Sequence, residues 1–326
     1  MKNTKKRLVI FCILLALPLC KADAQWLGLS AGGILNNNPF ARSYAWKIEY
    51  YDNIADNFLW SFIWYNEGHI KNHHRDGMLL QAWYRQPLVQ DKLFIAAGAG
   101  PFYFFDTTKD HAPGYEDVHA FAAGAGIDIW YYMTPRWALK TGAMFVLSEG
   151  ANANTVSLTL GAIYKFEDEQ TTRGRVPYLE YEGSNEITVY LGQTIVNSFQ
   201  SQKSMAVMVD YRRNIFKYLD VSAAFLNEGD SDVIRRNGII MQLWPTRRFA
   251  GGRLSLGAGL GAYIALDRHN NAPANTSTSA LAGIITMSAG YRLSFAPISL
   301  RASWNRTVTS YNRDTDIIMG GVGYYF

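Results

Sequence analysis

The chain contains an internal duplication. Residues 43–106 recur at 204–267 without a gap, so each residue of the first copy is matched 161 positions later. Because a repeat of this length is a structural unit, we expect two related halves with the same fold. The matched pairs include Ser43/Ser204, Tyr50/Tyr211, Asn66/Asn227, Glu67/Glu228, Gly68/Gly229, Trp83/Trp244, Gly98/Gly259 and Asp106/Asp267.

Apolar and polar residues alternate along many segments of each half. Between Thr155 and Phe166 every second residue is apolar, starting from Val156, and most residues between them are small or polar. This period of two is typical of β-strands with one apolar face, so the chain is predicted to be all-β and antiparallel. We expect strands in the first half near 26–35, 43–51, 58–67, 77–85, 92–105, 120–132, 137–147 and 155–166.

The N-terminal segment predicts export. Residues 1–24 have a basic start, an apolar run from Leu8 to Leu19 and an A-x-A site before Gln25, which is typical of a signal peptide. Both cysteines, Cys12 and Cys20, lie in this segment, so we expect no disulfide or thiolate chemistry in the mature chain. Without the signal the chain has 26 basic residues (31 less 5) and 26 acidic residues (27 less 1). This balance does not favour nucleic acid as a partner.

The duplication and the polar connections define the expected domains. Repeat unit 1 covers 25–166, a polar periplasmic linker covers 167–185, and repeat unit 2 covers 186–326. Connections after strands two, four and six are short, whereas those after strands one, three, five and seven are mostly longer and polar. In a membrane barrel, short turns face the periplasm and longer loops face the exterior, so the mature N-terminus is expected in the periplasm.

The last strand resembles the terminal strand of Gram-negative outer-membrane β-barrels. In TDIIMGGVGYYF, apolar residues share one face and the chain ends on Phe326, with Tyr324 third from the end. The resemblance implies that Tyr324 and Phe326 form a signal for the barrel-assembly machinery. It also implies location in the outer membrane, with membrane lipids and lipopolysaccharide as further partners.

Each half also resembles a small eight-stranded opacity-type barrel. Residues 122–145 and 287–306 carry this resemblance: a strand with glycine, a tight proline turn, and a strand that places Lys140 or Arg301 inward. Sixteen strands can form one continuous barrel or two separate eight-stranded barrels. We favour the single barrel, because strand eight can pair with strand nine, and keep the separate barrels as the alternative.

Alternation places polar side chains inside both halves. They are either a network that compensates buried charge or the lining of a pore that sets ion preference. The predicted lumen residues are Glu49, Glu67, Gln81, Arg85 and Lys140 in unit 1, and Asp210, Glu228, Gln242 and Arg301 in unit 2.

Histidines concentrate in two predicted loops of unit 1. A transition-metal site is one hypothesis, although unit 2 repeats the surrounding residues without histidine. A surface hydrolase acting on lipid A, as in the outer-membrane deacylases, is a second hypothesis, with His69, His74, Glu67 and Ser148 as candidates. The metal candidates are His69, His73, His74, His111 and His119.

The combined features favour a porin-like passive channel, and a non-enzymatic role over an enzymatic one. The alternatives are a closed twin barrel in adhesion or envelope stabilisation, or the surface hydrolase. No cofactor is expected, and the oligomeric state stays open.

Overall fold

The computed structural model describes residues 25–37, 40–70, 72–109, 114–148, 154–166, 184–267 and 279–326. The chain divides into two compact units, Met1–Asp168 and Glu169–Phe326. The predicted signal peptide and nearly all of the predicted linker lie outside the described residues. The strands of unit 1 are β1 (Gln25–Asn37), β2 (Phe40–Ala55), β3 (Phe58–Ile70), β4 (His73–Val89), β5 (Leu93–Thr108), β6 (Glu116–Tyr132), β7 (Trp137–Leu147) and β8 (Thr155–Lys165).

Unit 2 repeats this order of strands. β3 begins at Phe58 and β11 begins 161 residues later at Leu219, and the same offset relates both ends of β7 and β15. The strands of unit 2 are β9 (Asn185–Val196), β10 (Lys203–Phe216), β11 (Leu219–Asp230), β12 (Arg235–Phe249), β13 (Leu254–Asp267), β14 (Ser279–Arg292), β15 (Ile298–Val308) and β16 (Thr315–Tyr325).

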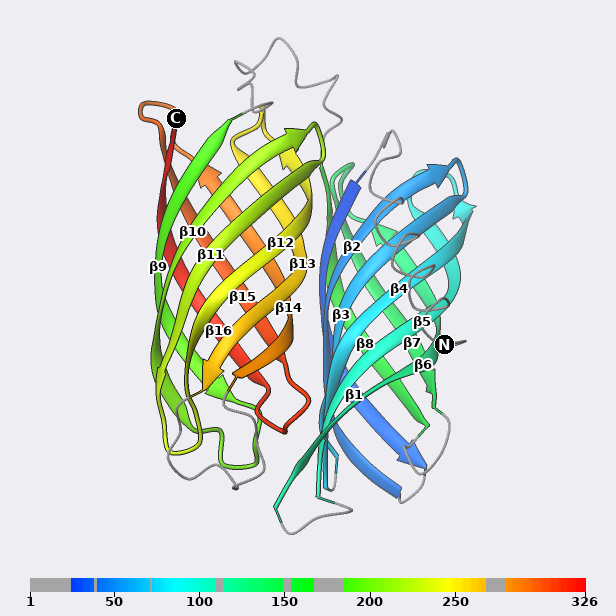
Figure 1. The fold of residues 1–326 in the computed structure, drawn as a ribbon. Coiled ribbons are helices and arrows are strands. Elements are labelled where there is room, and N and C mark those ends of the chain that lie inside the picture. The colour runs from blue at the N-terminus through cyan, green and yellow to red at the C-terminus, as the bar shows by residue number, and fades with distance from the viewer. Residues whose placement is uncertain are drawn as a thin grey trace, which may run out of the picture. The chain divides into compact units, whose positions relative to one another are not determined.

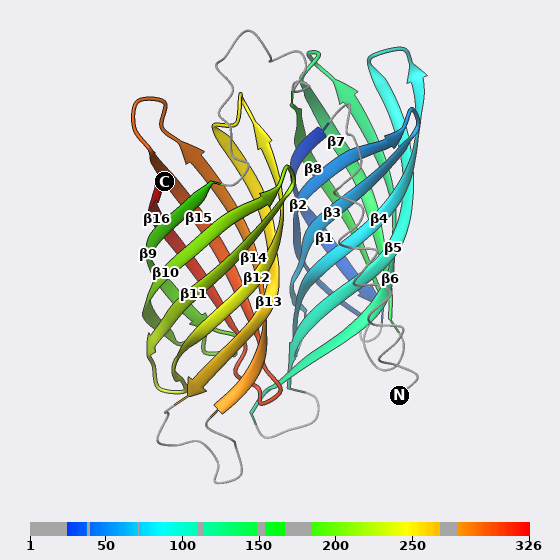
Figure 2. The same ribbon diagram turned by 45° about the horizontal axis from the view of Figure 1, so that its top comes forward.

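Each unit closes into its own antiparallel barrel (Figure 1). β8 pairs with β1 from Trp26 opposite Lys165 to Asn36 opposite Thr155. In unit 2, β9 pairs with both β10 and β16 (Figure 2). Our preference for one continuous barrel of sixteen strands is therefore wrong, and the alternative of two eight-stranded barrels is confirmed. Both edges of β8 are already paired, with β7 and with β1, so β8 has no free edge to offer β9.

The alternation in sequence sets the two faces of each barrel wall. In β8, Thr155, Ser157 and Thr159 are buried, whereas Leu158 and Leu160 are 67% and 64% exposed. A polar interior behind an apolar exterior is typical of a barrel that contacts lipid. Among the described residues, no helix is long and apolar enough to cross a membrane. Exposed apolar residues on the outside of unit 2 include Leu191, Met205, Phe225, Ile239, Ile264 and Leu281.

The histidine-rich stretch of unit 1 is the end of a hairpin. β3 continues to Ile70 and β4 already begins at His73, so both strands are longer than predicted. His69 lies opposite His74, and Ile70 lies opposite His73. The prediction of a loop over residues 68–76 is therefore wrong. We call this end of each barrel, where β3 joins β4 and β11 joins β12, the outer end, because the sequence predicts that it faces the cell exterior.

Candidate functional site

A tryptophan crosses the interior of each barrel at the same repeated position. The indole Nε1 of Trp83 donates to Ser61 Oγ at 2.8 Å, and that of Trp244 donates to Ser222 Oγ at 2.9 Å. Both tryptophans are almost completely buried. Repeated glycines, Gly98 and Gly259, lie beside these rings.

Glycine makes room for both rings. A Cβ atom added to Gly98 would lie 2.2 Å from Trp83, and one added to Gly259 would lie 2.7 Å from Trp244. A Cβ atom at Gly126, on the next strand β6, would lie 2.7 Å from Trp83. The Trp83 ring therefore extends from β4 across β5 to β6 inside the barrel.

Four charged residues of unit 1 compensate one another near the Trp83 ring. Lys140 on β7 forms ion pairs with Glu49 and with Asp128, the latter at 3.0 Å, and donates to the Tyr51 hydroxyl at 2.7 Å. Lys47 Nζ lies 3.4 Å from Glu49 Oε1. All five residues are at most 2% exposed. Two cations and two anions thus form a compact network, in which the predicted residues Glu49 and Lys140 meet.

Unit 2 compensates its buried charges with different ion pairs. Arg301 binds Glu186 on β9 and donates to the Tyr325 hydroxyl at 3.1 Å. Asp210 is 3.5 Å from Arg212, whose guanidinium stacks 3.7 Å from the centre of the Trp244 ring. Both predicted residues, Asp210 and Arg301, are buried, but each has its ion pair with a residue that the sequence did not single out.

A second ion pair spans the outer end of unit 1. Glu67 on β3 and Arg75 on β4 form a buried ion pair. Thr155, the first residue of β8, donates its hydroxyl to Glu67 and accepts a bond from Arg75 Nη2 at 3.3 Å. These three side chains link the β3–β4 hairpin across the interior to the last strand of the barrel.

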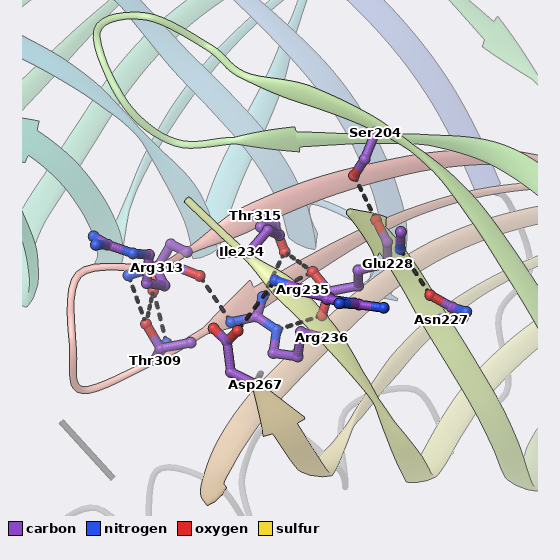
Figure 3. A network of polar contacts seen from close by, with 12 residues as sticks. Ser204, Asn227, Glu228, Ile234, Arg235, Arg236, Asp267, Thr309, Arg313 and Thr315 are labelled. Atoms are coloured by element: carbon purple, nitrogen blue, oxygen red, sulfur yellow. Dashed lines mark hydrogen bonds and ion pairs between the residues drawn. The ribbon is translucent and has the colours of Figure 1, made fainter. Parts of the chain in front are cut away.

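Unit 2 repeats this arrangement (Figure 3). Arg236 Nη2 donates to Glu228 Oε2 at 2.8 Å and to Thr315 Oγ1 at 3.0 Å, and the Thr315 hydroxyl donates to Glu228 Oε2 at 2.8 Å. Arg236 and Glu228 are 0% exposed. The sequence predicted Glu67 and Glu228 as lumen residues but missed their arginine and threonine partners.

The connection between β15 and β16 covers this pair. Arg236 Nη1 donates to the Tyr311 hydroxyl and to the carbonyl of Arg313, both at 3.0 Å. Arg313 Nε donates to the carbonyl of Val233, in the turn between β11 and β12, at 3.2 Å. Burial raises the pKa of the Tyr311 phenol, while the nearby Arg236 opposes this shift. The phenol therefore stays neutral at physiological pH.

The repeated Asn-Glu-Gly sequence has a structural role in each hairpin. Gly68 and Gly229 have positive φ angles of 64° and 82°, where the strand register shifts. This geometry is a β-bulge that favours glycine. The preceding asparagines brace the bulge, because Asn66 Oδ1 and Asn227 Oδ1 accept the glycine N–H at 2.9 and 2.8 Å. The glutamate binds the arginine eight residues later, and none of these roles requires histidine.

The other predicted lumen residues also belong to packed interiors. Gln81 Nε2 donates to the carbonyl of Gly124 at 3.2 Å, and Gln242 Nε2 donates to Thr286 Oγ1 at 2.9 Å. Arg85 is half-buried, with its guanidinium 4.8 Å from the centre of the Trp26 ring and 4.9 Å from that of Phe94.

The structure places the described histidines of unit 1 in three different environments. His73 is hydrogen-bonded to Asp106 at 2.8 Å, His119 packs edge-on against Phe105, and His69 lies against His74. His111 lies outside the described residues. Within the described ranges, no group of three or more histidine, aspartate or glutamate residues is placed to hold a metal ion.

The candidate hydrolase residues have the following contacts in the structure. Glu67 points inward to Arg75 and Thr155, whereas His69 contacts Tyr44 and His74. Ser148 lies after β7, and its backbone N–H donates to Asn154 Oδ1 at 3.0 Å. A nucleophile, base and orienting acid must be within hydrogen-bond reach of one another. The contacts above join His69 to His74, whereas they join Glu67 to Arg75 and Thr155.

Two aromatic residues at the end of the chain, Tyr324 and Phe326, lie on the outer face of the wall, whereas Tyr325 between them points inward to Arg301. Tyr324 and Phe326 are 55% and 58% exposed, and their rings stack with centres 6.4 Å apart. The backbone of Phe326 exchanges two hydrogen bonds with Asn185 at the start of β9, at 3.0 and 3.1 Å. The two residues predicted as an assembly signal are therefore accessible at the seam where barrel 2 closes.

Comparison with known proteins finds no matching family model and no matching curated protein. Solved structures do match. The N-terminal β-barrel domain of Pseudomonas aeruginosa OprF is 15% identical, with a TM-score of 0.36, over 44% of this chain and 98% of that chain. Neisserial surface protein A is 16% identical, with a TM-score of 0.36, over 44% and 99%. The NanC porin is 8% identical, with a TM-score of 0.23, over 91% and 98%. At these identities, the functions of these proteins do not carry over to this chain.

Proposed function

We propose that this protein is an outer-membrane protein with two sealed barrels. It serves as a membrane-embedded scaffold in adhesion or envelope stabilisation and does not act as a passive channel. The observation that carries this proposal is the repeated plug, Trp83 over Gly98 and Trp244 over Gly259. An eight-stranded barrel is just wide enough for side chains to fill it. The passive channel favoured by the sequence would need the wider lumen of a continuous barrel.

The paired charges support the same proposal. A lumen that attracts permeating ions would keep charged groups in contact with water. The charged side chains Glu49, Lys140, Glu228 and Arg236 are instead at most 2% exposed and bound to one another in pairs. Such pairs compensate charge that is buried in the protein.

The outer-membrane location rests on the barrel walls and the chain end. The apolar exterior suits lipid, and Tyr324 and Phe326 lie exposed on the closing strand. We expect the same partners as from the sequence: outer-membrane lipids, lipopolysaccharide and the barrel-assembly machinery.

Conductance in planar lipid bilayers tests the proposal. The mature protein should insert without current steps, under conditions in which a sixteen-stranded porin conducts. Folding of the same sample is checked by heat-modifiable gel mobility, so that a lack of current from unfolded protein is not mistaken for a sealed barrel. Regular steps of order nanosiemens in molar salt would overturn the sealed-barrel proposal.

Gene deletion separates the two scaffold roles. If the protein stabilises the envelope, cells without it should leak periplasmic enzymes and become sensitive to detergent. If it is an adhesin, the envelope should stay intact while binding to surfaces falls. Unchanged behaviour in both assays would contradict both roles.

A further inference from the structure

Two histidines form a cross-strand pair at the outer end of unit 1. His69 on β3 lies directly opposite His74 on β4. Their imidazole rings have centres 4.3 Å apart and are tilted by 38°. His69 is exposed and His74 is half-buried. Because opposite residues of neighbouring strands project from the same side of the sheet, both rings are on one face of the hairpin.

The duplicated hairpin has an ion pair at the same two positions. Asp230 and Arg235 stand 161 residues after His69 and His74 and are likewise opposite each other. Arg235 Nε lies 3.4 Å from Asp230 Oδ2, and both side chains are at least 60% exposed. The Asn-Glu-Gly residues before these positions and the Arg-x-Gly residues after them are shared by the two units, whereas residues 70–73 differ from 231–234. Where unit 2 has an anion and a cation, unit 1 therefore has two imidazoles, which carry no opposite charges.

We propose that His69 and His74 together bind one divalent transition-metal ion on the surface of the first barrel. Imidazole nitrogen is a preferred ligand of Zn²⁺, Cu²⁺ and Ni²⁺. Rotation of the two neighbouring side chains brings one ring nitrogen of each to a common ion. Two protein ligands leave the remaining positions to water, so the ion is exchangeable and held less tightly than in a closed structural site.

The other described histidines do not belong to this site. His73 on β4 is hydrogen-bonded to Asp106, and His119 on β6 packs against Phe105. Neighbouring residues of a strand face opposite sides, so His73 points away from the face that presents His74. The bound ion takes the place of the Asp230–Arg235 pair of unit 2, as a link between the two strands of the hairpin.

Metal titration of the tag-free mature protein, folded in detergent, tests this site. Cu²⁺ followed by electron paramagnetic resonance should show one bound ion with two nitrogen ligands, and Zn²⁺ should compete with it. The double variant H69D/H74R installs the pair of unit 2 and should fold normally while losing the signal. Loss of one imidazole, in H74A, should weaken binding by at least about tenfold, because even residues behind metal ligands have effects of that order.

The duplication also provides the reverse experiment. In D230H/R235H, unit 2 should gain the site, so the chain should bind two ions instead of one. The control variant H73A/H119A should keep the single ion of the wild type. The proposal is overturned if wild-type protein shows no nitrogen-coordinated Cu²⁺, if H69D/H74R still binds the ion, or if H73A/H119A loses it. If H69D/H74R fails to fold, H74A and D230H/R235H still decide the outcome.

Discussion

Removing the charge of Glu228 should destabilise the second barrel strongly. In the variant E228Q, Arg236 keeps its bonds to Thr315, Tyr311 and the Arg313 carbonyl, but its buried positive charge loses its counter-ion. Breaking a buried ion pair on one side costs about 3–5 kcal/mol. Since about 1.4 kcal/mol corresponds to a factor of ten, the folding equilibrium constant should fall by about two to three and a half orders of magnitude.

A double-mutant cycle separates the pair from its surroundings. R236M alone leaves the buried Glu228 carboxylate with the Thr315 hydroxyl but without a counter-ion, so it should be about as costly as E228Q. The double variant E228Q/R236M has no uncompensated charge and should be much more stable than the sum of the single effects predicts. We expect a coupling energy near the upper end of the usual range, about 3 kcal/mol.

Urea unfolding of the full mature chain in lipid, followed by tryptophan fluorescence, measures these free energies. The control D230N lies in the same hairpin but weakens an exposed pair, so it should cost about 0.5 kcal/mol or less. A cost of E228Q below about 1 kcal/mol, or additive effects of the two substitutions, would show that the buried pair does not stabilise the barrel as we reason.

Three further predictions concern other parts of the chain. G98A should reduce the yield of folded barrel, because its new Cβ would lie 2.2 Å from Trp83, whereas G320A, with no atom within 4 Å, should fold normally; gel mobility compares them. Deletion of Phe326 should slow assembly in cells, measured by pulse-chase, because this residue pairs with Asn185 at the barrel seam. A normal assembly rate would contradict this. Replacing the five histidines of unit 1 should leave the first barrel folded by the same mobility test, since unit 2 builds the hairpin without histidine. An unfolded product would show that these histidines are structural. They are His69, His73, His74, His111 and His119.

The sequence predicted the strands and the duplicated hairpin frame, because both depend on local patterns. Alternation in β8 and the offset between β3 and β11 are visible without a structure. The number of barrels does not depend on a local pattern, since β8 can pair with β1 or with β9 and its residues suit either neighbour. The sequence therefore could not decide how the barrels close.

The interior charges were predicted in part. Alternation identified Glu49 and Lys140 as inward, but the same rule applied to every strand would also have found Lys47 and Asp128. The partner of Arg301 was harder to predict, because Glu186 is on a strand more than a hundred residues away and has no counterpart in unit 1. Partners across a filled interior depend on side-chain length and strand stagger, which a sequence pattern does not contain.

The closure of each barrel on itself has an evolutionary consequence. Since β8 completes the first sheet and β16 the second, neither copy relies on the other for its backbone hydrogen bonds. Backbone pairing in one copy therefore places no constraint on substitutions in the other. This independence explains how one descendant of a common hairpin could acquire His69 and His74 while the other has Asp230 and Arg235. Duplication without fusion of the sheets has given this lineage two barrels that are free to diverge.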